Sequence, residues 1–309
     1  MSAELRFDDQ VVVITGAGNG LGRAYASEFS KRGARVVVND IGHAETSGAD
    51  QWQAELVAGE INESGGEAVA NTDSVVYGER IIESALDHFG QVDVLINNAG
   101  ILRDRSFHKM DENDWRDIQS VHLDGGYAVT RAAWPHMRAA SYGRVLFTSS
   151  AAGIYGNFGQ ANYAAAKMGL VGLGRALAIE GKSRGINVNM IAPVAASQLT
   201  ATVMPAAMLE QLSADLVTPL VVCLAHASCE ESGELFEVGG GWVTRLRWER
   251  SDPVTVPSAR EGHSAEALSQ NWSQLSSFTR QDHPRQVNDT FQAISEHSGI
   301  SLGIKPQAG

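Results

Sequence analysis

Short apolar runs alternate with longer segments of helical periodicity along most of the chain, and this alternation limits the folds open to it. Most of the runs are rich in Val and Ile, and several end in Gly, Asn, Asp or Ser. Such strands, separated by helices, predict a parallel sheet covered on both faces. The predicted strands are 11–16, 34–40, 67–73, 92–100, 143–150, 186–193 and 233–241, and the predicted helices include 21–32, 80–89, 113–137 and 161–184.

The turn after the first predicted strand contains Gly16, Gly20 and Gly22, in the stretch TGAGNGLG. Glycines allow a tight turn, a close approach of the backbone to a pyrophosphate, and close contact between helix and strand. The N-terminus of the next helix would add backbone N–H groups and a partial positive charge. The spacing differs from the common G-x-G-x-x-G, because Leu21 occupies the last position. Asp40 ends the second strand, where an acidic residue would meet an adenosine ribose, so the pattern predicts nucleotide binding.

Tyr163 and Lys167 lie four positions apart, so on a helix they share one face. Alone, this spacing also fits an interfacial tyrosine beside a solvated lysine. Oxidation of a secondary alcohol needs a base for the hydroxyl proton, and a free tyrosine, with a pKa of about 10, is a poor base at neutral pH. A nearby ammonium would favour the phenolate and lower that pKa. Ser150, at the end of the fifth strand, would orient the substrate oxygen and stabilise its developing charge.

Four motifs together resemble the short-chain dehydrogenase/reductase family, and their order and spacing cover roughly the first 240 residues. They are TGAGNGLG at 15–22, NNAG at 97–100, the serine pair at 149–150, and the YxxxK of Tyr163 and Lys167. The resemblance implies a Rossmann-type doubly wound parallel sheet of about seven strands, a nicotinamide cofactor and oxidoreductase activity. It also implies that Lys167 hydrogen-bonds the nicotinamide ribose.

The resemblance and the motifs assign roles to individual residues, and no metal site is expected. Two positions depart from the family pattern. His122 stands where the family usually has Asn, which we interpret as a substitute member of a proton relay, with a buried structural histidine as the alternative. Val194 follows Pro193 where the family prefers Gly. The catalytic candidates are Ser150, Tyr163, Lys167 and His122, the substrate contacts are Ser150 and Tyr163, and the cofactor contacts are Gly16, Asn19, Gly20, Leu21, Gly22, Asp40, Asp73, Ser74, Val75, Asn98, Ala99, Gly100, Tyr163 and Lys167.

We expect the cofactor to be NAD. The carboxylate of Asp40 should accept hydrogen bonds from the ribose hydroxyls, whereas a 2′-phosphate there would place like charges in contact. Neither Asn39 nor Ile41 offers a compensating cation, and Asn19 stands where NADP-using relatives often carry a basic residue. The alternative, a surface aspartate that caps a turn, is less favoured because Asp40 follows the apolar run VVVN.

Four longer stretches resemble the (3R)-hydroxyacyl-CoA dehydrogenase subfamily in detail: NNAGILRDRSF, TRAAWPHM, SSAAGIYGNFGQANYAAAK and LFEVGGGWVTRLRWER. This resemblance implies an acyl-CoA substrate and a role in fatty-acid β-oxidation. A 3-oxoacyl carrier-protein reductase or a hydroxysteroid dehydrogenase would share every motif, and a nucleotide-binding scaffold without turnover is an alternative from another class. Arg103 and Arg105 could meet a phosphate of coenzyme A, although a solvated loop is the favoured interpretation. Trp242 and Trp248 are expected to pack at a subunit contact.

Charge and composition exclude several other classes. The net charge of −12 argues against a nucleic-acid partner, because phosphate backbones select clustered Lys and Arg. The two cysteines, Cys223 and Cys229, fit free thiols in a reducing compartment. The N-terminus has no apolar signal-peptide core, the C-terminus ends KPQAG and not Ser-Lys-Leu, and no apolar run is long enough to span a membrane. We therefore expect an intracellular protein, cytoplasmic or peroxisomal.

The last part of the chain differs in composition from the rest. We divide the chain into a dehydrogenase domain at 1–250 and a C-terminal extension at 251–309, which is richer in Ser, Gln, Asn and His. In the extension, EALSQNWSQLSSF predicts one amphipathic helix. We expect the extension to pack on the domain or on a partner subunit, with partial disorder as the alternative. Apolar segments in the predicted helices 161–184 and 213–227, together with the family resemblance, suggest a homodimer or larger assembly.

Overall fold

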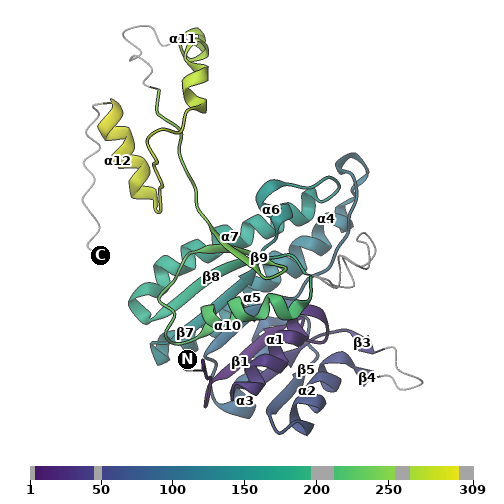
Figure 1. Ribbon diagram of the computed structural model, residues 1–309. Coiled ribbons are helices and arrows are strands. Elements are labelled where there is room, and N and C mark those ends of the chain that lie inside the picture. The colour runs from purple at the N-terminus through teal and green to yellow at the C-terminus, as the bar shows by residue number, and fades with distance from the viewer. Residues whose placement is uncertain (1–3, 45–50, 196–211, 255–264, 299–309) are drawn as a thin grey trace. The chain divides into compact units, whose positions relative to one another are not determined.

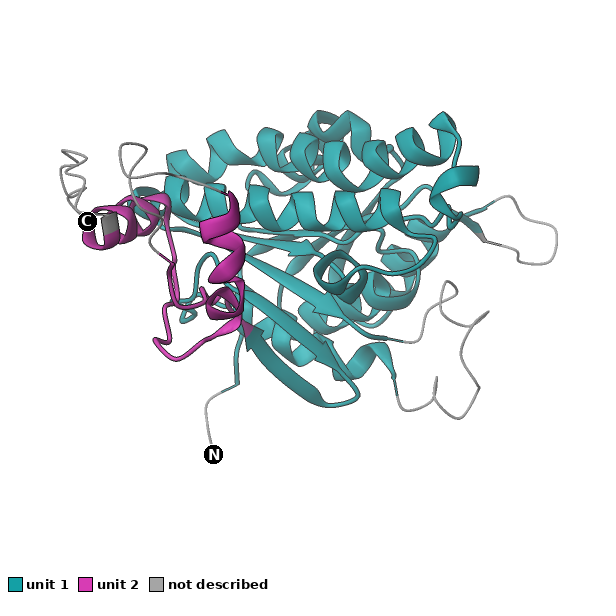
Figure 2. Ribbon diagram, turned by 90° about the horizontal axis from the view of Figure 1, so that it is seen from above, with its two compact units in different colours: residues 1–245 teal, residues 246–309 magenta. Residues whose placement is uncertain are grey.

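The computed structural model describes residues 4–44, 51–195, 212–254 and 265–298. The chain divides into two compact units, Met1–Arg245 and Leu246–Gly309 (Figure 2). The first unit contains every residue that the sequence assigns to catalysis or to cofactor binding. That the C-terminal extension packs on the dehydrogenase domain or on a partner subunit stays a prediction.

The first unit is built on one large sheet, which has eight strands in the described residues (Figure 1). The strand order is β10-β9-β8-β7-β6-β1-β2-β5, and every pairing from β9 through to β5 is parallel. Buried apolar residues on both faces explain the near-continuous Val and Ile runs of the sequence. The strands are β1 (Val11–Thr15), β2 (Arg35–Asn39), β5 (Glu67–Asn71), β6 (Val94–Asn97), β7 (Gly143–Thr148), β8 (Ile186–Pro193), β9 (Leu235–Gly239) and β10 (Trp242–Leu246).

Helices cover both faces of this sheet. One layer contains α1, α2 and α10, and the other contains α3, α5 and α7 (Figure 1). This is the doubly wound arrangement predicted from the alternation of strands and helices. The bounds are α1 (Gly20–Lys31), α2 (Gln53–Glu63), α3 (Gly78–Phe89), α4 (Glu112–Ile118), α5 (Gly125–Ala140), α6 (Ala151–Tyr155), α7 (Ala161–Gly181) and α10 (Thr218–Ala225).

The chain reverses its winding direction between β1 and β6. From β1 the chain adds strands on one side, through β2 to β5, and then returns to place β6 on the other side of β1. In open parallel sheets, ligands bind outside the carboxyl ends of the strands at such a reversal. The fold therefore places the expected site next to the ends of β1 and β6, where the glycine turn and the NNAG motif lie.

Two expectations differ in detail from the structure, and a third is confirmed. The predicted helix 113–137 is three consecutive pieces, because a π-helical turn, η3 (Gln119–Asp124), separates α4 from α5. The eighth strand, β10, follows β9 after Gly240 and Gly241, both with positive φ, and the sequence analysis did not predict it. Cys223 lies in α10 and Cys229 beyond its end, and both are free cysteines, as predicted.

The second unit is small and has its own local structure. Its described helices are α11 (Ala265–Gln270), η6 (Trp272–Ser276) and α12 (Val287–Ser298), so the single helix predicted over EALSQNWSQLSSF is interrupted at Asn271. Asp252 accepts hydrogen bonds from the hydroxyls of Ser277, at 2.6 Å, and Thr279, at 2.7 Å. Arg250 forms an ion pair with Asp282, with 3.4 Å between the charged atoms.

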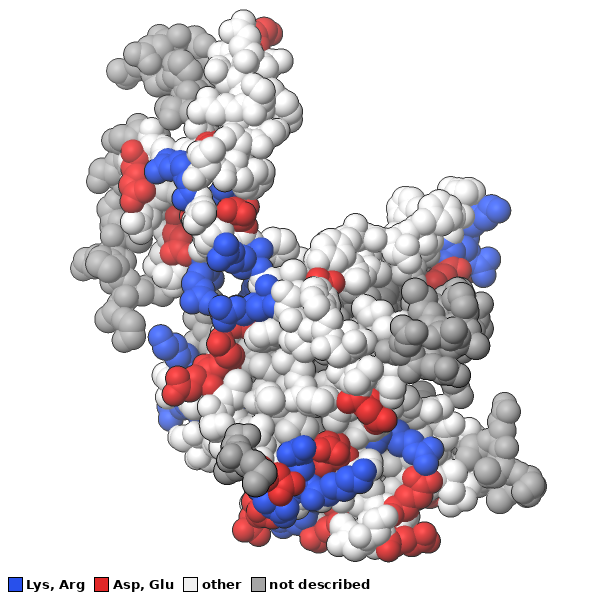
Figure 3. Space-filling model, in the orientation of Figure 1, with Lys and Arg blue, Asp and Glu red and all other residues white. Residues whose placement is uncertain are grey.

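Acidic and basic side chains are interspersed on the surface of the first unit. In Figure 3 they lie next to one another over the lower part of this unit, where Figure 1 places α1 and α2. One contact of this kind joins the two helices, because Arg23 and Glu60 form an ion pair of 2.7 Å. Such pairs leave the net charge of −12 unchanged, and each contributes little to stability.

Candidate active site

The glycine turn brings the backbone of the loop between β1 and α1 close to the NNAG segment. Gly16 has φ +64°, and a Cβ added to it would lie 2.7 Å from the Cα of Ala99. A Cβ on Gly22 would overlap the carbonyl oxygen of Gly16. Gly20 differs from both, because it has φ +51° and a Cβ there would meet nothing within 4 Å. Two glycines therefore permit tight packing of the loop, and the third leaves backbone open towards a ligand.

Helix α1 begins directly in this loop. Asn19 is its N-cap, and the Asn19 side chain accepts a hydrogen bond of 2.7 Å from the N–H of Gly20. The N–H groups of the first helical turn, which include those of Leu21 and Gly22, have no intrahelical acceptors, and they carry the positive end of the helix dipole. The loop and the helix end together suit a pyrophosphate, as the sequence predicted.

Asp40 follows β2 and lies beside the glycine loop. Its Oδ2 accepts the N–H of Gly18 at 2.9 Å, and its Oδ1 accepts the N–H of Gly42 at 2.7 Å. Each oxygen therefore keeps acceptor capacity for a hydroxyl. The carboxylate fixes the glycine loop as well as presenting its oxygens, and the sequence pattern did not reveal this second role.

The residues at 73–75 are held by a pair of buried asparagines that the sequence analysis did not single out. Asn39 Nδ2 donates to the Oδ1 of Asn71 and to the carbonyl oxygen of Asp73, each at 2.8 Å. Asn71 Nδ2 in turn donates to Asp73 Oδ2 at 3.0 Å. The signal was present in the sequence, because both asparagines end otherwise apolar strands. These bonds fix the start of the Asp73, Ser74 and Val75 segment beside Asp40, whose N–H donates to the carbonyl oxygen of Asn71.

The NNAG motif supports the glycine loop from the other side. Asn98 Nδ2 donates to the carbonyl oxygens of Thr15 and Gly16, at 3.1 and 3.0 Å. The N–H groups of Asn98 and Ala99 both donate to the hydroxyl of Thr15. The segment predicted to contact the cofactor thus lies against the cofactor loop, across the point where the sheet reverses.

Tyr163 and Lys167 lie in the first two turns of α7, and Ser150 is the N-cap of α6. Lys167 is 3% exposed, and its Nζ donates a 2.7 Å hydrogen bond to the carbonyl oxygen of Thr148, the last residue of β7. The same Nζ lies 5.5 Å from the centroid of the Tyr163 ring. A hydrogen bond joins the side chains of Tyr163 and Ser150. The structure therefore brings these three candidates together at the carboxyl end of β7.

Burial dominates the electrostatics of this group. It lowers the pKa of Lys167 to about 7, because a buried ammonium loses its hydration. Burial also raises the pKa of the Tyr163 phenol above its ordinary value, while the hydrogen bond with Ser150 acts in the opposite direction. The sequence analysis expected a net lowering through the charge of Lys167, and in this structure desolvation of the phenol outweighs such an effect.

His122 lies in the π-helical turn η3 and faces the same site. Its ring stands edge-on to that of Tyr163, and its Nε2 lies 2.8 Å from the carbonyl oxygen and 3.1 Å from the nitrogen of Ile101. Its Nδ1 is buried and has no protein partner. Burial, and then the charge of Lys167, lower the pKa of His122 to about 3, so the imidazole is neutral at physiological pH. A Cβ on Gly100 would meet this ring at 2.5 Å, which explains the glycine there.

Other predicted positions have clear locations. Arg105 forms an ion pair of 2.7 Å with Asp114, and Arg103 one of 3.5 Å with Asp117, so both have carboxylate partners within the protein.

Trp242 and Trp248 remain partly exposed in the chain, and the subunit contact predicted for them stays a prediction. Val194 follows β8, and its N–H donates to the carbonyl oxygen of Val238, but residues 196–211 of the same loop lie outside the described residues.

Comparison with known sequences decides the family. The sequence model described as "short chain dehydrogenase" matches residues 10–209, a range that contains the glycine loop, Ser150, Tyr163 and Lys167. The chain belongs to this family. As a short-chain dehydrogenase it is expected to use a nicotinamide cofactor, and the glycine loop, the α1 N-terminus and the carboxylate of Asp40 provide groups that fit one.

Several known proteins resemble this dehydrogenase over nearly its whole length. It is 50% identical over 309 residues to the peroxisomal multifunctional enzyme type 2 of Mus musculus. The aligned region covers 99% of this chain and 42% of the relative. It is 50% identical to the peroxisomal hydratase-dehydrogenase-epimerase of Saccharomyces cerevisiae, over 96% of this chain and 34% of the relative. The dehydrogenase thus spans less than half the length of these two relatives.

Solved structures give the same result. The full-length peroxisomal multifunctional enzyme type 2 of Drosophila melanogaster is 40% identical, with a TM-score of 0.82 over 94% of this chain and 50% of that one. A short chain dehydrogenase of Mycobacterium avium is 36% identical, with a TM-score of 0.76 over 88% of this chain and 96% of that one.

Within the described ranges, helices are all too short or too polar to cross a membrane. In the same part of the chain, His, Cys, Asp and Glu side chains do not gather in groups of three or more that could hold a metal ion.

Proposed function

We propose that the chain is an NAD-dependent dehydrogenase that interconverts (3R)-3-hydroxyacyl-CoA and 3-oxoacyl-CoA in fatty-acid β-oxidation. One observation carries this proposal. About half of all residues are identical to those of relatives named "multifunctional enzyme type 2" and "hydratase-dehydrogenase-epimerase", and the match includes the C-terminal extension. Because this chain corresponds to only part of each relative, the proposal is limited to a dehydrogenase step.

The chemistry follows from the side chains around Tyr163. A nicotinamide cofactor, held by the glycine loop and Asp40, would supply the hydride acceptor for the substrate carbon. The Tyr163 phenolate would take the hydroxyl proton. The Ser150 hydroxyl, which lowers the pKa of the phenol in the ligand-free site, would donate its single proton to the substrate oxygen once substrate is bound. We propose that Lys167, with its pKa near 7, contacts the nicotinamide ribose and carries positive charge close to the ring of Tyr163.

The choice of NAD rests on Asp40. Its carboxylate is held by two backbone N–H groups, so it cannot easily swing away from a 2′-phosphate. Two nearby cations are engaged elsewhere: Arg23 forms a 2.7 Å ion pair with Glu60, and Arg35 donates to the carbonyl oxygen of Asp9 at 2.8 Å. We therefore propose that the site disfavours NADP through uncompensated like charge.

Steady-state kinetics across a chain-length series of 3-hydroxyacyl-CoA and carrier-protein thioesters tests the proposal. We expect CoA thioesters with R configuration to be oxidised more efficiently than a small free alcohol, because remote binding energy positions the reacting carbon. Tyr163→Phe is the matched control for chemistry, and it should bind NADH normally while turnover collapses by at least about 10³-fold. Preference for carrier-protein thioesters and NADPH would instead favour a 3-oxoacyl carrier-protein reductase, a named relative of which is 36% identical over 76% of this chain.

Assembly and location complete the proposal. We propose a homodimer or larger homo-oligomer, for which sedimentation at micromolar concentration is the direct test. We propose a peroxisomal or cytoplasmic location, on the basis that the relatives carry peroxisomal names.

A further inference from the structure

Asn162, the residue before Tyr163, is fully buried and uses all of its polar side-chain atoms. Its Nδ2 donates to the carbonyl oxygen of Arg103 at 3.1 Å and to that of Asp114 at 2.8 Å. Its Oδ1 accepts the N–H of Tyr163 at 2.8 Å. Gln119 Nε2 donates to its main-chain oxygen at 2.9 Å. One amide therefore joins the first turn of α7 to two other segments.

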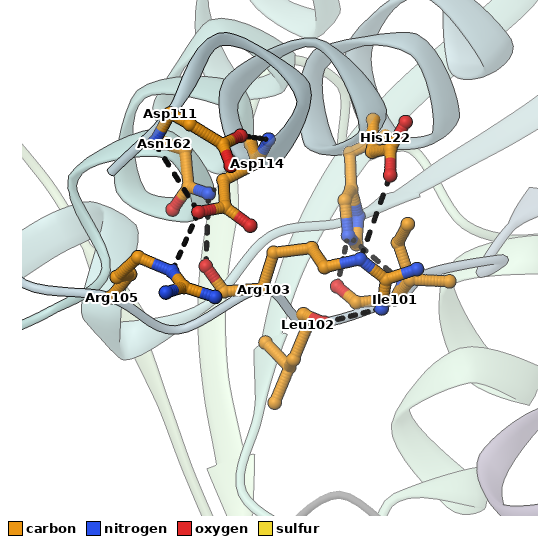
Figure 4. A network of polar contacts seen from close by, with 9 residues as sticks. Ile101, Leu102, Arg103, Arg105, Asp111, Asp114, His122 and Asn162 are labelled. Atoms are coloured by element: carbon orange, nitrogen blue, oxygen red, sulfur yellow. Dashed lines mark hydrogen bonds and ion pairs between the residues drawn. The ribbon is translucent and has the colours of Figure 1, made fainter. Parts of the chain in front are cut away.

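These two segments are the loop 101–105 and the start of α4, and Figure 4 shows them with Asn162 and His122. The loop 101–105, which follows β6 and NNAG, begins at Ile101, whose backbone meets Nε2 of His122. The same loop ends at Arg105, whose guanidinium pairs with the Asp114 carboxylate at 2.7 Å. Asn162 binds the same loop at Arg103 and helix α4 at Asp114. The loop, the start of α4 and the start of α7 thus share one network, with Tyr163 at its edge.

The bond to Tyr163 has a particular effect on geometry. The first N–H groups of a helix lack intrahelical acceptors, so the start of α7 is fixed only if another group accepts them. Asn162 accepts the N–H of the residue that carries the phenol. A displacement of about 1 Å in a catalytic group can lower turnover by about 10²-fold, so a buried anchor at this position bears on the reaction.

We propose that Asn162 is a positioning residue, which fixes the Tyr163 phenol relative to Ser150 and to the loop 101–105 that faces the substrate. This inference rests on the proposed function of Tyr163 as the base. In the described residues, the titratable groups that face the phenol are Lys167 on α7, His122 on η3 and Asp104 in the loop. Asn162 is neutral, so it acts through position and not through its own charge.

The experiment compares Asn162→Ala and Asn162→Ser with a matched control, Asn189→Ala, in the full chain. Asn189 is also a buried asparagine whose amide joins two backbone groups, but it lies within β8 and contacts Glu231 and Glu234. Substitution of either asparagine should lower thermal stability. Asn162→Ser keeps a hydroxyl near the start of α7, so it is the variant to measure if Asn162→Ala fails to fold.

For Asn162→Ala we expect kcat to fall by about 10- to 100-fold, with a smaller loss for Asn162→Ser and NADH affinity within about twofold of the parent. The pH profile of kcat should move to higher pH, because a displaced phenol loses the Ser150 hydrogen bond that lowers its pKa. Unchanged kcat and pH profiles in both Asn162 variants, matching Asn189→Ala, would overturn the proposal.

A second measurement separates this inference from the proposed function. The phenolate absorbance of Tyr163, taken as the difference between each chain and the same chain with Tyr163→Phe, reports its pKa without any substrate. If the parent chain oxidises no 3-hydroxyacyl-CoA, the proposed function fails, and the titration still tests Asn162. If the parent is active but the phenol pKa is the same in all chains, Asn162 only stabilises the fold.

Discussion

The ring of His122 stands edge-on to the ring of Tyr163, with centroids 5.1 Å apart and an interplanar angle of 88°. This contact places a neutral, buried imidazole against the proposed base. It also leaves Nδ1 of His122 without a partner inside the protein. A relay role would use this atom, whereas a purely structural histidine would leave it as a cost to stability.

The low pKa of His122 predicts a specific loss of stability in acid. Its folded pKa of about 3 lies below the unfolded value of about 6.5, so between these pH values the unfolded chain binds a proton that the folded chain does not. Stability contributed by the neutral ring is present above pH 6.5 and decreases as the pH falls towards 3. Between pH 7.5 and 4.5, the free energy of unfolding of the parent should fall by about 2 kcal/mol more than that of His122→Asn. Urea denaturation at the two pH values measures this, and equal losses in both chains would contradict it.

The burial of Lys167 should lower the stability of the folded chain, although the proposed reaction needs this residue. Burial lowers its pKa to about 7, so the folded chain binds this proton less readily than the unfolded chain from pH 7 up to about 10.4. Stability should therefore rise with pH in that window. Lys167→Met removes the penalty and loses one hydrogen bond to Thr148, so at pH 7 it should be more stable by on the order of 2–3 kcal/mol, with the difference shrinking towards pH 10. Denaturant midpoints at the two pH values test this prediction, and the variant should also lose turnover. A variant that is less stable than the parent at both pH values would contradict the lowered pKa of Lys167.

Two glycines of the same unit should respond in opposite directions to alanine. A Cβ on Gly22 would overlap the carbonyl oxygen of Gly16, so Gly22→Ala should destabilise the chain by at least about 2 kcal/mol and weaken NADH binding. Gly59 lies inside α2, and an added Cβ there would meet no atom within 4 Å. Gly59→Ala should therefore raise the free energy of unfolding of the chain by roughly 0.5–1 kcal/mol. Thermal unfolding and NADH titration of both variants measure the contrast. Normal NADH affinity in Gly22→Ala would argue against a cofactor at this loop.

Asp40→Ser should change cofactor preference and also loosen the glycine loop. The variant loses the carboxylate that disfavours a 2′-phosphate, and it weakens the bonds to the N–H groups of Gly18 and Gly42. We expect NAD affinity to fall by about tenfold and the preference for NAD over NADP to narrow by a similar factor. Binding titrations with both cofactors provide the measurement. A parent chain that prefers NADP would reverse this interpretation of Asp40 and strengthen the carrier-protein reductase alternative.

Much of this protein could be predicted from the sequence, because the relevant signals are local. Apolar runs such as 11–16 report burial on both faces of a strand, and glycines at 16, 20 and 22 report a backbone that must approach something closely. The four-residue spacing of Tyr163 and Lys167 reports a shared helix face. The positions of most strands, the glycine loop and the shared helix face of these two residues therefore follow from periodicity and residue type.

Tertiary structure alone decided which groups meet, because such contacts join segments far apart in the chain. Asn162 meets the carbonyl oxygens of Arg103 and Asp114, and Asn39 meets Asp73, although no periodic pattern connects these positions. The pKa of Tyr163 is likewise a property of burial: the charge four residues away favoured a lower pKa, and desolvation by the packed site raised it. Desolvation depends on every atom around the group, which a sequence specifies only once the chain has folded.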